Sequence, residues 1–130
     1  MSLINTPISV GELLDKITIL EIKSEKIKDT EKLKNINHEL SLLTEIWSQG
    51  GFEGEAMEDL RGQLKKVNQT LWVIEEDIRV EEKRKSFGEK FIQLARNVYF
   101  ENDTRAKVKK EVNLLTGSEL VEEKSYEDYQ

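Results

Sequence analysis

The stretch that decides the fold is MEDLRGQLKKVNQTLWVIEEDI, residues 57–78. Its large apolar side chains recur in alternating steps of three and four residues: Met57, Leu60, Leu64, Val67, Leu71, Ile74 and Ile78. This spacing places them on one stripe of an α-helix, and it is the a/d pattern of a coiled-coil seam. The pattern predicts a long helix that continues to about Arg84, weakened only by Gly62.

Two shorter helices are predicted before this stretch. Ser9 and Glu12 have the spacing of a capping box, which predicts a helix that ends near Lys28. Asp29 and Thr30 are both good N-cap residues for a second helix. Both segments carry apolar residues at three- and four-residue steps, so each is expected to bury one face.

Turn signals mark both ends of the long helix. The glycine-rich segment 48–55 predicts a loop before it, anchored by Phe52. After it, Ser86 and Glu89 repeat the capping-box spacing, which predicts a helix that starts near Phe87.

The last helix allows two interpretations. Asn102 and Asp103 could cap a separate fifth helix, or they could be polar residues on one helix that continues to Gly117. The apolar spacing favours one continuous helix. The sequence therefore predicts an all-α antiparallel bundle of about four helices, or five if the chain breaks near Asn102.

The chain is expected to form one domain, residues 1–130, with an extended N-terminal arm at 1–8 and an acidic tail at 118–130. Its 26 acidic and 20 basic residues give a net charge of -6, which argues against nucleic-acid binding. It contains no cysteine, so disulfides, thiolate metal sites and cysteine nucleophiles are excluded. With no signal peptide or long apolar run, a cytoplasmic location without membrane contact is expected.

Several blocks of the sequence resemble a small bacterial and phage domain family of unknown function. The blocks are GELLDKITILEIK at 11–23, LWVIEEDIR at 71–79, FG at 87–88, LARNVY at 94–99, NDTRA at 102–106 and LVEEKSY at 120–126. The resemblance spans nearly the whole chain. It implies a setting beside sugar-transfer or surface-polysaccharide functions and no particular reaction.

Polar residues interrupt the apolar stripes of the first and last helices, and this arrangement has two interpretations. Buried polar groups must be paired, so they can form an internal network of ion pairs and hydrogen bonds, for example between Asp15 or Asp77 and one of the arginines, that sets the helix register. The candidates for that network are Asp15, Asp77, Asn102 and Asp103. Alternatively, basic side chains can form a pocket for an anionic ligand or a sugar phosphate. The candidates for that pocket are Lys16, Arg79, Arg96, Tyr99 and Arg105.

No motif in the sequence identifies a catalytic nucleophile, a metal site or a cofactor. The acidic pair Glu55 and Glu58 has no second pair of the kind that magnesium-dependent helical hydrolases use, and His38 has no partner motif. We therefore expect a non-enzymatic interaction module that self-associates through the 57–78 helix or binds a protein partner. The alternative is a ligand-binding protein or an enzyme of sugar or nucleotide metabolism that uses the basic cluster.

Overall fold

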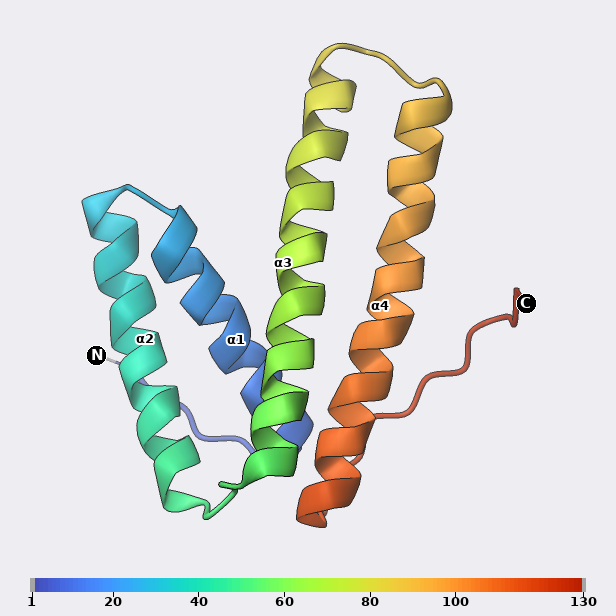
Figure 1. The fold of residues 1–130 in the computed structure, drawn as a ribbon. Helices are drawn as coiled ribbons and strands as arrows, with labels where there is room; N and C mark the ends of the chain where they lie inside the picture. Colours follow the sequence, from blue (N-terminus) through green and yellow to red (C-terminus); the bar gives the residue numbers. More distant parts are fainter. Residues whose placement is uncertain (1, 130) are drawn as a thin grey trace.

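The computed structural model describes residues 2–129 and contains four helices within that range (Figure 1). The helices are α1 Val10–Lys26, α2 Thr30–Gln49, α3 Glu55–Lys83 and α4 Glu89–Thr116. Residues 2–129 include no β-strand, so the predicted all-α class is confirmed. Met1 and Gln130, the outermost residues of the predicted arm, tail and domain, lie outside the described residues.

The helices form two antiparallel hairpins, α1–α2 and α3–α4, that diverge from each other (Figure 1). α1 packs against all three other helices, whereas α2 packs along α1 alone. α3 has 29 residues and α4 has 28, against 17 in α1 and 20 in α2. The α3–α4 hairpin therefore projects beyond the end of α1.

Side-chain caps fix the starts of α1 and α2. The Ser9 hydroxyl accepts the Glu12 N–H at 3.1 Å, and the Asp29 carboxylate accepts the Lys32 N–H at 3.0 Å. Both caps satisfy a backbone N–H that has no partner within the helix. α1 ends at Lys26, two residues before the predicted end, because the next residue has extended backbone angles.

The start of α4 differs from the prediction. Its N-cap is Gly88, without a side-chain hydrogen bond, and the helix begins at Glu89. The predicted cap, Ser86, instead closes α3: Lys85 adopts a left-handed conformation, and the Ser86 N–H bonds to the Glu81 carbonyl at 3.0 Å. This backbone pattern is a Schellman C-cap, so Ser86 belongs to the end of one helix and not to the start of the next.

α4 is one continuous helix through Asn102 and Asp103, so the continuous interpretation is confirmed and a fifth helix is absent from the described chain. It ends at Thr116 and is capped by Gly117, whose left-handed backbone (φ 64°) suits glycine. The residues that follow, 118–129, have no helix or strand and run beside α4.

The core lies where α1 meets α3 and α4. Its largest fully buried apolar side chains are Leu14, Ile17, Ile22, Leu64 and Val112. Phe52 packs on Trp47 with ring centres 4.8 Å apart, and so holds the glycine-rich loop against this core. All four helices also present polar faces, and among residues 2–129 no helix is both long and apolar enough to cross a membrane.

Burial along the α3 stripe is complete at the base of the α3–α4 hairpin and uneven above it, where Ile74 is still only 6% exposed. Leu64 and Val112 at the base are 0% exposed. One and two heptads above Leu64, Leu71 and Ile78 are only half-buried, as is Leu94 on α4. The reason is that α1 covers the base of the hairpin and ends below its tip (Figure 1).

Candidate functional site

A buried carboxylate lies at the centre of the polar residues predicted to interrupt the apolar stripes. Asp15 is on the face of α1 that meets α3 and α4, and it is 1% exposed. A carboxylate at this depth requires hydrogen-bonding partners, because burying an unpaired charge costs several kcal/mol. The partners come from two other helices.

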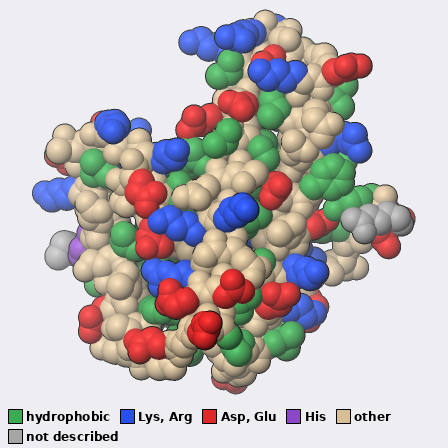
Figure 2. Space-filling view, viewed as in Figure 1, with side chains coloured by type: hydrophobic (Ala, Val, Ile, Leu, Met, Phe, Trp, Pro, Cys, Tyr) green, Lys and Arg blue, Asp and Glu red, His purple; other side chains and the backbone are tan. Residues whose placement is uncertain are grey.

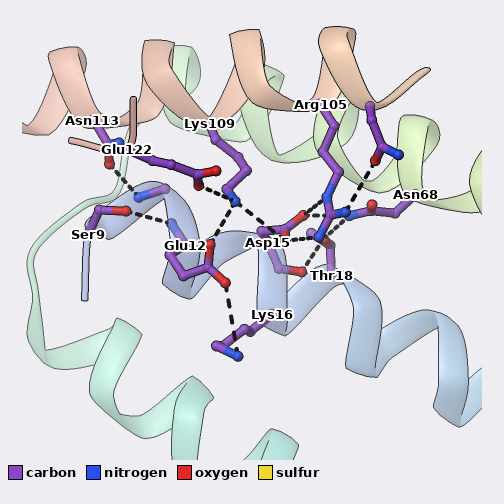
Figure 3. A network of polar contacts seen from close by, with 12 residues as sticks. Ser9, Glu12, Asp15, Lys16, Thr18, Asn68, Arg105, Lys109, Asn113 and Glu122 are labelled. Carbon is purple, nitrogen blue, oxygen red and sulfur yellow. Dashed lines mark hydrogen bonds and ion pairs between the residues drawn. The ribbon is translucent and has the colours of Figure 1, made fainter. Parts of the chain in front are cut away.

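Arg105 of α4 holds Asp15 with a two-pronged ion pair (Figure 3). Its Nε lies 2.9 Å from Asp15 Oδ1, and its Nη2 lies 2.5 Å from Oδ2. From α3, the Asn68 amide donates to Asp15 Oδ1 at 2.9 Å and to the Thr18 hydroxyl oxygen at 3.0 Å. One carboxylate thus joins α1, α3 and α4.

Lys109, one turn beyond Arg105, extends the network toward the tail. Its ammonium lies 2.6 Å from a Glu12 carboxylate oxygen, 2.9 Å from one of Glu122 and 4.0 Å from one of Asp15. Burial lowers the pKa of Lys109, but the hydrogen bonds to Glu12 and Glu122 outweigh this effect and the pKa ends above its ordinary value. Lys109 therefore stays charged and links α4 to both α1 and the tail.

The start of α1 lies very close to α4. The Gly11 N–H donates to Asn113 Oδ1 at 2.6 Å, and the Val10 N–H donates to the Ser118 hydroxyl at 3.1 Å. A Cβ atom at Gly11 would lie 2.4 Å from the Lys109 carbonyl oxygen. Only glycine permits this approach of the two backbones.

The network is close to electrically neutral. Its carboxylates are Asp15, Glu12 and Glu122, and its cations are Arg105, Lys109 and, at 3.9 Å from Glu12, Lys16. The hydrogen bond to Asp15 raises the pKa of Arg105 above its ordinary value. The three negative charges balance the three positive ones, so the network has little excess charge with which to attract an anion. Its ion pairs instead hold the helices in position.

The five residues considered for an anionic pocket do not converge. Arg79 and Arg105 line one 420 Å³ cleft between α1, α3 and α4, but each is already paired with a carboxylate, Arg79 with Glu75 at 2.5 Å. Lys16 is exposed on α1. Arg96 lies over the Phe100 ring at 5.6 Å, and Tyr99 faces the tail.

Of the four residues considered for a structural network, only two belong to the network around Arg105. Asp15 is its centre, and Asn102 accepts a 3.4 Å hydrogen bond from Arg105. Asp103 accepts a hydrogen bond from the Tyr129 hydroxyl of the tail. Asp77 is exposed on α3 and has no hydrogen bond or ion pair with the network residues described.

Several members of the network were not predicted. Asn68 and Lys109 lie beside the apolar stripes, four residues after Leu64 and three before Val112, which is a weak signal of burial. Glu122 lies in a segment without periodicity, so no local pattern could identify it. Within residues 2–129, no group of three or more His, Cys, Asp or Glu side chains is arranged to hold a metal ion.

Together, the fold and the site define a small all-helical protein whose helices are joined through a buried carboxylate. The chain belongs to DUF6165, a family of unknown function, whose model matches residues 4–129. This finding confirms the predicted membership of a small domain family without assigned activity. Comparisons with curated proteins and with solved structures give no significant match.

Acid is expected to release the tail from α4. The hydrogen bond from Lys109 lowers the pKa of Glu122 below its ordinary value of 4.5. The ion pair therefore stabilises the tail fully above pH 4.5, and this stabilisation is lost as the pH falls through the lowered pKa of Glu122. Glu122→Gln should reproduce this loss at neutral pH. We expect faster amide hydrogen exchange at residues 118–129, with less than about 1 kcal/mol lost in global stability because the Glu122 side chain is part-exposed.

Glu123→Gln is the matched control for this measurement. Glu123 is more exposed than Glu122 and lies 3.8 Å from Lys110, so its replacement should leave exchange in the tail unchanged. Equal effects of the two substitutions would show that the Lys109 contact does not hold the tail.

Proposed function

We propose that this protein is a non-enzymatic interaction module that self-associates through the projecting part of the α3–α4 hairpin. The surface, here called the hairpin face, consists of Ile78, Phe91 and Leu94, together with Leu71, which lies at the edge of α1 and lines a cleft with Ile19 and Ile22. The observation that carries the proposal is a contrast between heptad positions of α3: Leu64 is fully buried under α1, whereas Leu71 and Ile78 are half-buried, although Ile74 between them is 6% exposed.

The hairpin face consists of large apolar residues of the kind found in a protein core, but these residues are only half-buried. Spacing of seven residues on α3 and three on α4 keeps its members on the same side of their helices. Hydrophobic side chains are visible on the projecting part of the hairpin in Figure 2. Phe87, at the tip, packs edge-on against Phe91 with ring centres 5.2 Å apart and is 50% exposed, which extends the apolar surface.

A second copy of the chain is the partner that fits this face. Two hairpins packed through identical faces give a four-helix arrangement in which every apolar stripe is covered, and such a two-fold contact is self-complementary. The border of the face is self-complementary too. Glu75 and Arg79, paired within one chain, offer opposite charges that two copies can exchange.

The alternative, a ligand pocket built from the basic cluster, has less support. Its candidate residues lie on separate surfaces, and the two that share a cleft are neutralised by Glu75 and Asp15. A self-associating module requires only the apolar stripe.

Light scattering on the parent chain and two double variants tests the proposal. Leu71→Gln with Ile78→Gln should shift the molar mass at micromolar concentration from at least twice 15.1 kDa to that of one chain. Val73→Gln with Val80→Gln is the matched control, because these residues are 49% and 45% exposed and lie about 200° further around α3. The control should keep the mass of the parent.

A parent chain that is monomeric at this concentration would contradict the proposal. So would a Leu71→Gln, Ile78→Gln variant that folds, as judged by helical circular dichroism, and keeps the parent mass.

A further inference from the structure

A cavity of about 1040 Å³ lies between α4 and the C-terminal tail. Its size is slightly above the usual range for small-molecule sites, about 300–1,000 Å³. α4 contributes one wall, which includes Tyr99, Asn102 and Asp103, and the tail contributes the other, which includes Lys124, Tyr126 and Tyr129. The cavity is separate from the hairpin face and shares none of its four residues.

The tail is fixed on both sides of this cavity. Before it, the Glu122 carboxylate binds Lys109 at 2.9 Å. After it, the Tyr129 ring packs against Tyr99 and Phe100, each with a centre-to-centre distance of 5.3 Å, and its hydroxyl donates to Asp103. The residues between these anchors therefore form one wall of a cavity that is open to solvent, where Tyr126 is 79% exposed.

Aromatic rings are prominent in the lining. Tyr99, Tyr126 and Tyr129 all border the cavity, and the faces of such rings attract cations. The protein already shows this preference locally: the Lys124 ammonium lies 5.7 Å from the centre of the Tyr126 ring, and the Arg96 guanidinium lies 5.6 Å from that of Phe100.

The charges of the lining favour the same kind of ligand. Asp103, Glu127 and Asp128 supply three carboxylates, and Lys124 is the one basic residue among the lining residues described. The hydrogen bond to Asp103, followed by desolvation and the negative charge of Asp103, raises the pKa of Tyr129 to about 12. The surroundings thus disfavour an added anion and favour an added cation.

We propose that the cavity between α4 and the tail binds a flexible organic cation of the diamine or polyamine class. Ammonium groups would lie against the tyrosine faces and pair with Asp103 and Glu127, while the methylene chain covers Val98 and Ala106. The same chemistry could come from a lysine side chain of a protein, so the test includes a probe for that source.

Isothermal titration calorimetry at pH 7.5 with spermidine, putrescine, 1,4-butanediol and a capped lysine amide tests the proposal. Spermidine should bind more tightly than putrescine, and butanediol, which replaces both ammonium groups by hydroxyls, should not bind. Binding of the capped lysine amide without binding of spermidine would overturn the polyamine proposal and point to a protein lysine as the source of the cation. The Leu71→Gln, Ile78→Gln variant should bind as the parent does, which separates this test from that of self-association.

Three substitutions locate the binding. Asp103→Asn and Tyr126→Ala should each weaken spermidine binding at least about tenfold, whereas Tyr126→Phe, which keeps the ring, should change it little. Asp77→Asn removes an exposed carboxylate from α3 and controls for general attraction to an acidic protein. The proposal is overturned if spermidine fails to bind at about 1 mM, or if Asp103→Asn and Asp77→Asn weaken binding equally.

Discussion

Arg105→Met is expected to lower the free energy of unfolding by about 3–5 kcal/mol, because it leaves the buried Asp15 carboxylate without its ion-pair partner. Methionine keeps most of the apolar stem of arginine, so the change acts mainly on the charge. Asn68 and the Lys109 ammonium, 4.0 Å away, remain, but neither replaces the two hydrogen bonds of the guanidinium. Urea denaturation followed by circular dichroism measures the effect.

The same substitution at Arg79 is the control. Arg79 also pairs with a carboxylate, Glu75, but its side chain is 73% exposed, so Arg79→Met should change stability by no more than about 0.5 kcal/mol. If Arg105→Met costs no more than Arg79→Met, the Asp15 network does not hold α1 to α4.

Gly11→Ala and Gly62→Ala are expected to shift stability in opposite directions. At Gly11 the new methyl group would lie 2.4 Å from the Lys109 carbonyl oxygen, so α1 and α4 must separate, at a cost of about 1–3 kcal/mol or more. At Gly62, in the interior of α3, no atom outside the helix lies within 4 Å, and alanine should stabilise by about 0.4–1 kcal/mol.

Thermal and urea unfolding of the two variants provide the measurement. Each substitution adds one methyl group to a helical glycine, so the comparison isolates the packing at Gly11. A stable Gly11→Ala protein would mean that the two helices are not in close backbone contact.

The helices were predictable because their signals are local. The three-four spacing of residues 57–78, the Ser9 and Asp29 caps and the glycines near residue 50 each act within one turn of helix or one loop. The start of α4 was predicted wrongly for a local reason as well. Ser86 fits an N-cap by composition, and only the backbone of the preceding residues shows that it closes α3.

The candidate site was predictable only in part, because its contacts join distant segments. The sequence suggested that Asp15 or Asp77 pairs with one of the arginines, but nothing in the spacing selected Asp15 and Arg105, which are 90 residues apart. Nothing in the sequence distinguishes Lys109 from the other lysines of the last helix. Glu122, the tail residue that binds it, is likewise one of several acidic residues in the tail. Periodicity describes one helix at a time, so it cannot say which residues meet across helices.

The network and the hairpin face are connected through the position of α1. Asp15, Arg105 and Gly11 fix α1 against the base of the α3–α4 hairpin. Because α1 ends at Lys26, the upper part of the hairpin is left without a helix of this chain over it (Figure 1). The site that stabilises the fold thereby determines which apolar residues are available to a partner.

The most direct test of self-association uses the absence of cysteine from the chain, which makes one introduced thiol a unique label. Ile78→Cys places the thiol on the hairpin face, and Val80→Cys places it on the exposed side of the same helix. We predict that maleimide labelling at residue 78 slows as the protein concentration rises through the micromolar range, while labelling at residue 80 keeps one rate. A rate at residue 78 that does not change with concentration would contradict the proposal that a second copy covers this face.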